Sequence, residues 1–293
     1  VATRIFLIYL CLTLLIFLLF QISGIRLFDS LNLTMTAISS GGFIPTDSLN
    51  NIIKNNFQTA VLCFAFFLSI FNFYLFYNII LKRNNLREHR EDIYLFLLAI
   101  IFSMIFYLSN DLGLMTVLVT VLSSMSNSGI SNIEIPGNFA LFFIILALLG
   151  GSVLSTTSGL KFLRIYILIK AFFMEIYKLV KPNVMLSTKI MFSEKKINNE
   201  NIKISFLIFI LFFLSLFILS SILLVDILDF ENSFKLSILT LTNTVASSIY
   251  GMEKIDFTNL FTFTKISLII FMIVAKVELL AVFILIRKVF FKN

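Results

Sequence analysis

Three short segments share the pattern Ser-x-x-Gly followed by an apolar residue, and each could offer backbone oxygens to a cation. They are SSGGF at residues 39–43, SNSGI at 126–130 and SIYGM at 248–252. Glycine permits left-handed backbone angles, which turn successive carbonyl oxygens to one side. A ring of such carbonyls can replace the water around a dehydrated cation. The repetition therefore predicts three pore loops, and ordinary helix connections with glycine at the turn are the alternative interpretation.

A fourth segment, GGSVLSTTSG at residues 150–159, interrupts the long apolar run 139–180. Its Gly, Ser and Thr residues disfavour a helix interior. Because about eleven apolar residues precede it, the break falls roughly 16 Å along the helix, near the middle of a bilayer. Broken helices at that depth are typical of permeation sites, which predicts a mobile flap beneath the filter. Close helix packing through small residues is the alternative.

Lys276 lies ten residues into the last apolar run, too deep for its side chain to reach water easily. An ionisable group at this depth is typical of an ion pathway, where a fixed ammonium would oppose a continuous leak of cations. A structural pair with Glu278, or with carbonyls of the broken segment, is the alternative. Lys161 and Arg164, just beyond the break, either face the inner vestibule or extend towards the membrane interface.

The residues needed for catalysis are not grouped anywhere in the apolar segments. Cys11 and Cys63 lie in apolar runs, with no second Cys or His near either, so packing is their expected role. The one histidine, His89, lies in a basic stretch and is expected in a solvated loop. The sequence therefore predicts a protein that is not an enzyme and that carries no covalently bound cofactor. Nucleic acid is not an expected partner.

The composition places the chain in a lipid bilayer. Only 13% of its 293 residues are charged, 59% are hydrophobic and the mean hydropathy is +1.02, whereas a soluble domain carries about 25% charged residues. Six apolar runs are long enough to cross a membrane; they cover residues 5–23, 57–80, 93–108, 139–180, 204–225 and 266–286. Most Lys and Arg residues lie at the termini and in two connecting loops, so both termini are predicted to be cytoplasmic.

Each Ser-x-x-Gly segment follows a short apolar stretch and is flanked by one crossing before it and one after it. The chain therefore reads as an all-α integral membrane protein with three repeats of helix, re-entrant pore helix with filter loop, and helix. The repeats cover residues 1–81, 93–180 (broken at 150–159) and 204–293. Cytoplasmic segments 82–92 and 181–203 connect them.

Several stretches resemble TrkH, the membrane subunit of bacterial Trk-type potassium-uptake systems, within the Trk, Ktr and HKT superfamily. They are LFDSLNLTMTAISSGGFIPTDS, LLGGSVLSTTSGLKFLRIYILIK with the KPN-containing segment after it, and IVAKVELLAVFILI. The resemblance covers nearly the whole chain. Its most specific element is a GGxxxSTxxGxK-like core, matched by Gly150, Gly151, Ser155, Thr156, Gly159 and Lys161.

The resemblance implies a function and a set of site residues. It implies K+ uptake across the cell inner membrane, a homodimer and a cytoplasmic nucleotide-binding ring of the TrkA type. It implies a gating loop at residues 150–159 and a pore cation at Lys276. It also implies filter roles for Ser40, Gly41, Gly42, Phe43, Asn127, Ser128, Gly129, Ser248, Ile249, Tyr250 and Gly251.

The chain departs from the family pattern in three ways. Lys276 stands where the family commonly has Arg, which keeps the charge but loses the planar fork. The last filter lacks the usual Asn-containing run before its glycine. The three repeats match the second, third and fourth repeats of a pseudo-fourfold pore, so the first must come from the natural chain or from a partner. Na+ is therefore the alternative ion, and a non-conducting or assembly subunit is the competing hypothesis.

Overall fold

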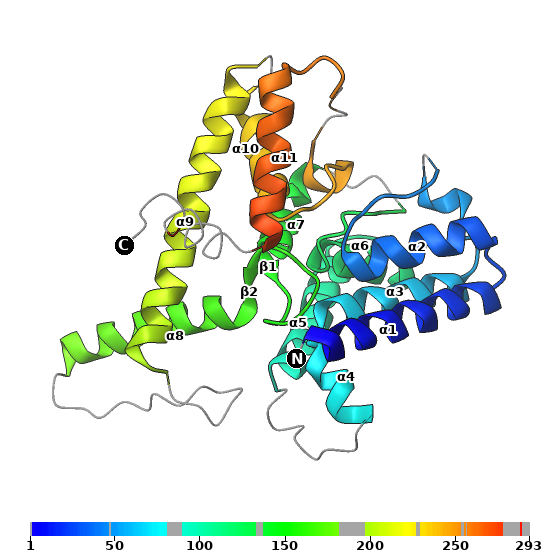
Figure 1. Ribbon diagram of the computed structural model, residues 1–293, viewed down its shortest axis with the longest axis horizontal. Coiled ribbons are helices and arrows are strands. Elements are labelled where there is room, and N and C mark those ends of the chain that lie inside the picture. The colour runs from blue at the N-terminus through cyan, green and yellow to red at the C-terminus, as the bar shows by residue number, and fades with distance from the viewer. Residues whose placement is uncertain are drawn as a thin grey trace.

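The computed structural model describes residues 2–46, 48–80, 90–132, 137–181, 197–226, 229–252, 255, 257–277 and 288. Within these ranges the chain is predominantly helical, and its helices form three consecutive units (Figure 1). The predicted all-α membrane fold is confirmed. His89, Glu278 and most of the predicted cytoplasmic segments lie outside the described residues.

Each unit contains a long helix, a short re-entrant helix and a further helix. Unit 1 comprises α1 (Ala2–Ile22), α2 (Leu27–Ser39), the 3-10 turn η1 (Leu49–Asn51), α3 (Asn56–Ile70) and α4 (Phe73–Ile80). Unit 2 comprises α5 (Arg90–Leu108), α6 (Leu114–Met125), η3 (Gly137–Phe139), α7 (Ala140–Leu148), β1 (Leu149–Gly150), β2 (Leu160–Lys161) and α8 (Phe162–Val180). Unit 3 comprises α9 (Asn199–Leu224), α10 (Phe230–Leu241), η4 (Ser248–Tyr250) and α11 (Thr262–Val277).

The first helix, α1, is almost uniformly apolar, yet one of its sides is buried and another is exposed. Its buried residues Ile8, Leu12, Ile16 and Phe20 recur every four positions, which places them on one side of an α-helix. That side faces the rest of unit 1, where α1 packs on α2 and α3. Leu14 and Leu18, on another side, stay exposed. A helix that is apolar all round and only partly buried is suited to lipid contact.

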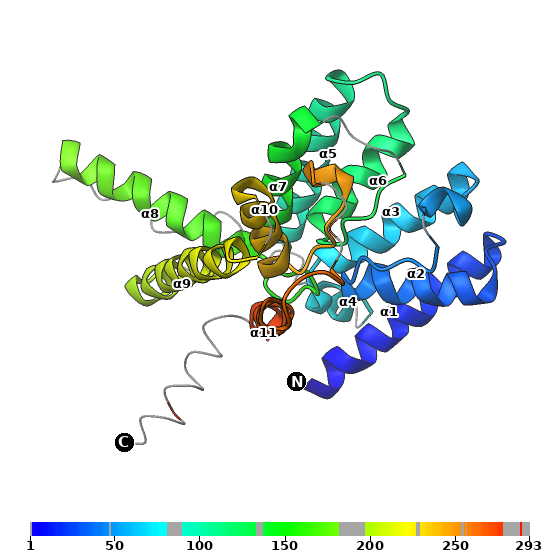
Figure 2. The same cartoon turned by 90° about the horizontal axis from the view of Figure 1, so that it is seen from above.

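The units follow one another around a common centre. Unit 1 contacts unit 2 through α3 and α6, and unit 2 contacts unit 3 through α7 and α10. In Figure 2 the groups α1–α3, α5–α7 and α9–α11 extend in different directions from this centre. One hydrophobic cluster of buried side chains runs through all three units. Helix α8 extends away from the other helices of unit 2 and lies against α9.

Three of the six predicted crossings are single helices of spanning length. Among the described residues, α1, α5 and α9 are long and apolar enough to cross a membrane. The fourth run is interrupted as predicted, with α7 and α8 on either side of the break. The last run is described as α11 as far as Val277.

The second run was predicted as one crossing; it is not one continuous helix, because the chain is extended at Phe71 between α3 and α4. Asn72 stabilises the break. Its side-chain Oδ1 accepts a hydrogen bond from the N–H of Tyr74 (2.9 Å), and its own N–H donates to Asp92 (2.9 Å). The break also leaves carbonyls at the end of α3 without helical donors, and these become binding groups for unit 2.

Candidate functional site

The three re-entrant helices end in the same hydrogen-bonded turn. In each, a backbone N–H donates to the carbonyl five residues earlier, as follows: Gly41 to Thr36 (2.9 Å), Ser128 to Ser123 (2.9 Å) and Thr244 to Leu239 (2.8 Å). The residue before each donor has a left-handed backbone: Ser40 (φ 56°), Asn127 (φ 61°) and Asn243 (φ 52°). This is the Schellman ending of a helix. Residues 40–42, 127–129 and 243–245 are therefore equivalent, and we call them loops 1, 2 and 3.

Loop 3 is not where the glycine pattern predicted it. The predicted segment at Ser248, Ile249, Tyr250 and Gly251 forms η4 and the following turn, several residues beyond the end of α10. Its buried Tyr250 donates a hydrogen bond to Ser124 (3.2 Å), so this turn braces α6. The glycine pattern marks the turn after η4 because loop 3 carries Val245 where loops 1 and 2 carry glycine, and the next glycine, Gly251, lies six residues further along the chain.

The left-handed residues fasten each loop with their side chains. Asn127 donates to the carbonyl of Ala147 (2.7 Å) at the end of α7, and Asn243 donates to the carbonyl of Met272 (3.1 Å) in α11. The hydroxyl of Ser40 lies 3.4 Å from that of Thr156. Asn127 also donates to Thr244 of loop 3 (3.2 Å). Each loop is thus held by a bond to another element.

The three loops meet, and two glycines permit the contact. Gly42 has φ 75°, and a Cβ at that position would lie 1.9 Å from the carbonyl oxygen of Ser128. Gly129 has φ 71°, and a Cβ there would lie 2.7 Å from the carbonyl oxygen of Val245. Any other residue would separate the loops or clash. Phe43, also predicted in the filter, is 70% exposed beside loop 1.

Residues 149–161 form a closed segment between α7 and α8. Strands β1 and β2 pair in parallel and bring the two ends of the segment together. Gly150 is needed for this pairing, since a Cβ there would lie 2.4 Å from the carbonyl oxygen of Ser158. Gly159, with φ 72°, makes the returning turn. Inside the segment, buried Lys161 donates to the carbonyls of Thr157 (2.7 Å) and Ser155 (3.3 Å).

The segment attaches to the broken end of α3. The N–H of Ser152 donates to the carbonyl of Ile70 (3.0 Å), and the N–H of Phe73 donates to the carbonyl of Leu154 (3.2 Å). The hydroxyl of Thr156 donates to the carbonyl of Ser69 (3.2 Å). In an unbroken helix, the carbonyls of residues 69 and 70 would accept from residues 73 and 74. The break therefore supplies the groups that hold the 149–161 segment.

Two buried acidic residues at the start of α5 support this junction, and the sequence analysis did not predict their role. Glu91 is 9% exposed and accepts a hydrogen bond from the hydroxyl of Ser152 (3.3 Å). Asp92 is 2% exposed and accepts from the N–H of Asn72 (2.9 Å). Both lie at the edge of a basic stretch, where charged residues are expected to face water. The polar residue Asn72 inside an apolar run was the only signal of a partner nearby.

Lys276 joins the end of α2 to the 149–161 segment. Its Nζ donates to the carbonyl of Ser39 (3.1 Å), at the end of α2, and to the carbonyl of Thr156 (2.8 Å). The expected contact with carbonyls of the broken segment is thus present, and Glu278 lies outside the described residues. Lys276, Lys161 and Arg164 line one cavity of about 210 Å³ together with the hydroxyl-bearing residues of the segment.

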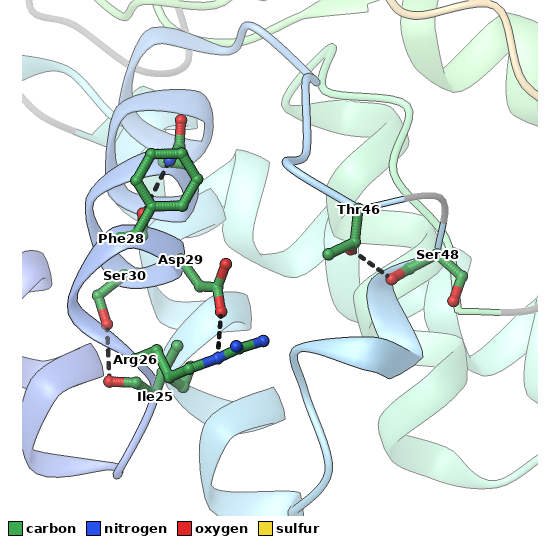
Figure 3. A network of polar contacts seen from close by, with 8 residues as sticks. Ile25, Arg26, Phe28, Asp29, Ser30, Thr46 and Ser48 are labelled. Carbon is green, nitrogen blue, oxygen red and sulfur yellow. Dashed lines mark hydrogen bonds and ion pairs between the residues drawn. The ribbon is translucent and has the colours of Figure 1, made fainter.

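The N-terminal ends of α2 and α10, which lie at the opposite end of each helix from its loop, carry acidic residues. At the start of α2, Asp29 is buried and pairs with Arg26 (Nε to Oδ2, 3.2 Å), as Figure 3 shows. In the first turn of α10, a hydrogen bond from Lys235 holds the pKa of the Glu231 carboxyl below its usual value. Carboxylates near a helix N-terminus are favoured by the helix dipole, whose negative end here points towards the loops.

Two known proteins resemble the chain in sequence. No protein-family model matches the sequence. The chain is 26% identical to a protein of Methanocaldococcus jannaschii described as an uncharacterized cation transporter, over 98% of this chain and 59% of that protein. It is 28% identical to the Trk system potassium uptake protein TrkH of Halomonas elongata, over 62% of this chain and 41% of that protein.

A crystal structure of the potassium transporter TrkH from Vibrio parahaemolyticus has the same fold. The TM-score is 0.81 at 19% identity, over 97% of this chain and 63% of the solved one. The chain thus spans about 60% of the length of the first relative and of the solved structure. The predicted resemblance is confirmed in sequence and in fold, and the relatives are transporters rather than enzymes.

Proposed function

We propose that this chain, which resembles TrkH-type transporters in sequence and shares their fold, contributes three pore units to a pathway for monovalent-cation uptake, with K+ as the favoured ion. The observation that carries the proposal is the meeting of three equivalent loops at one centre. Each loop follows a short helix whose C-terminal end, the negative end of its dipole, is directed at that centre. Backbone oxygens gathered there would replace the water around the ion.

The 149–161 segment and Lys276 would regulate this pathway from below the loops. The segment contacts loop 1 through Thr156, and Lys276 places an ammonium between the two. A fixed positive charge next to a cation path raises the free energy of an ion that stops there. Release of the Thr156 carbonyl by Lys276 would detach the segment from α11, so we propose that these contacts are part of the closed gate.

The surroundings of the pathway are also part of the proposal. The exposed apolar side chains of α1, α5 and α9 suit a lipid bilayer, and the basic segments favour cytoplasmic termini in a cell inner membrane. A fourth unit, from the natural protein or from a partner, would complete a pseudo-fourfold ring. A homodimer and a TrkA-type cytoplasmic ring are proposed from the family resemblance.

The test is uptake of radioactive rubidium by proteoliposomes that contain the full-length protein. An inside-negative potential should drive uptake, and external K+ should compete better than Na+. Stronger competition by Na+ would identify sodium as the transported ion. Absence of uptake at every membrane potential would reject the proposal. The competing non-conducting subunit has no support from the relatives, both of which are described as transporters or uptake proteins.

A further inference from the structure

Val245 occupies the position in loop 3 at which loops 1 and 2 have glycine. The equivalence follows from the shared hydrogen bonds, which pair Thr244 with Gly41 and Ser128 and therefore pair Val245 with Gly42 and Gly129. Both glycines have positive φ angles, whereas Val245 does not. A β-branched residue is strongly disfavoured in the left-handed region. Loop 3 therefore cannot turn its carbonyls as the other two loops do.

The side chain of Val245 reaches loop 1. A Cβ placed on Gly42 would lie 2.5 Å from Cγ2 of Val245, so the methyl group packs directly against the bare Cα of Gly42. The carbonyl oxygen of Val245 faces Gly129, where a Cβ would lie 2.7 Å from it. A single valine thus contacts both of the other loops, one through its backbone and one through its side chain.

The same side chain borders an open space. Val245 is only partly buried. With Gly41 and Phe43 of loop 1 and residues of α10 and α11, it lines a cavity of about 450 Å³. Val245 therefore borders both this cavity and Gly42 of loop 1. A methyl group offers no oxygen to a cation, and an apolar constriction resists the entry of water and ions.

We propose that Val245 is a hydrophobic constriction that limits cation flux through the filter and weakens its preference for K+. This inference rests on the proposed cation pathway. Glycine at this position would remove the methyl group from Gly42 and allow loop 3 to take the backbone of the other loops. The filter would then gain a carbonyl ligand and lose an apolar barrier.

The experiment compares initial rates of rubidium uptake, and competition by K+ and Na+, for the reconstituted full-length protein and its variants. Val245→Gly should raise the initial rate of rubidium uptake about tenfold, which corresponds to a modestly lower free-energy barrier to permeation. It should also make K+ a stronger competitor relative to Na+. Val245→Ala, which keeps a Cβ but removes both methyl groups, should give an intermediate rate. Ala246→Gly is the matched control, because it adds a glycine to the same chain segment without altering the contact with Gly42; its rate should match that of the unmodified protein.

The outcomes separate this inference from the proposed function. Equal uptake by the unmodified protein and by folded Val245→Gly and Val245→Ala variants would overturn the constriction and leave the cation pathway standing. Equal gains from Val245→Gly and Ala246→Gly would also overturn it, since flexibility alone would then explain the effect. No uptake by any of the proteins would overturn the pathway and the constriction together. If Val245→Gly does not fold, the uptake rate of Val245→Ala tests the constriction: a higher rate than that of the unmodified protein supports it, and an equal rate overturns it.

Discussion

At Lys276 a single ammonium contacts both the end of a pore helix and the 149–161 segment. Replacement by Gln removes the charge but keeps a hydrogen-bond donor, on a side chain that is one bond shorter. Because a cation near the pathway would no longer be repelled, Lys276→Gln should increase the initial rate of rubidium uptake by about tenfold. The measurement is flux at fixed membrane potential, normalised to the amount of reconstituted protein.

Lys276→Arg is the matched control for the charge, and its flux should stay close to that of the unmodified protein. Unchanged flux in Lys276→Gln, together with lower yield of folded protein, would show that the two hydrogen bonds serve stability rather than gating.

A substitution at Gly129 tests the proposed role of loop 2 in the filter. Alanine would place a Cβ 2.7 Å from the carbonyl oxygen of Val245, and its left-handed backbone would cost roughly 1–2 kcal/mol. Gly129→Ala should therefore abolish discrimination between K+ and Na+, measured by competition against rubidium uptake. Gly113→Ala is the control, because the nearest atom to a Cβ there is 3.7 Å away. Preserved discrimination in Gly129→Ala would contradict the assignment of loop 2.

Hydrogen bonds stabilise the break between α3 and α4, and a substitution at Asp92 tests their contribution to stability. Asp92→Ala would leave the half-buried N–H of Asn72 without its acceptor, a loss of about 1 kcal/mol. The melting temperature in detergent should fall. Asp92→Asn keeps an acceptor oxygen and should lower it less. Equal melting temperatures for Asp92→Ala and the unmodified protein would show that Asp92 does not support the junction.

Much of the arrangement of elements could be predicted from local composition. The glycine- and serine-rich stretch 150–159 disfavours a helix whatever surrounds it, so the break before α8 was visible in the sequence. The break at Phe71 was not, because it depends on Asp92 and Leu154, which are distant in sequence. A polar residue inside an apolar run is compatible with an unbroken helix.

The site was predictable where the backbone requires glycine and unpredictable where it does not. Gly42 and Gly129 mark loops 1 and 2, because their conformations and contacts exclude a side chain. In loop 3 the corresponding residue is Val245, and only the hydrogen bond from Thr244 to Leu239 identifies the loop. The carboxylates of Glu91 and Asp92 were missed because their burial is a property of the packed units.

For the whole molecule, the distribution of basic residues implies a membrane orientation that can be measured. With Cys11 and Cys63 replaced by serine, a single cysteine at Asn50, after loop 1, should react with a membrane-impermeant maleimide from outside the cell. A single cysteine at Lys178, in α8, should react only after permeabilisation. Both positions are exposed, so access depends on the membrane alone. The opposite pattern would show that the orientation from basic residues is inverted.

The pairing of β1 with β2 has a mechanical consequence. Because the ladder ties the two ends of residues 149–161 together, force applied along α8 cannot lengthen the segment; it displaces the segment as one body. Its attachments to the region of α3 and α4 are single hydrogen bonds of 3.0 to 3.2 Å, to Ser69, Ile70 and Phe73. Torque from the proposed cytoplasmic partner on the protruding α8 would therefore be transmitted, with α8 as a lever arm, to residues 149–161 as a whole, which directly precede that helix.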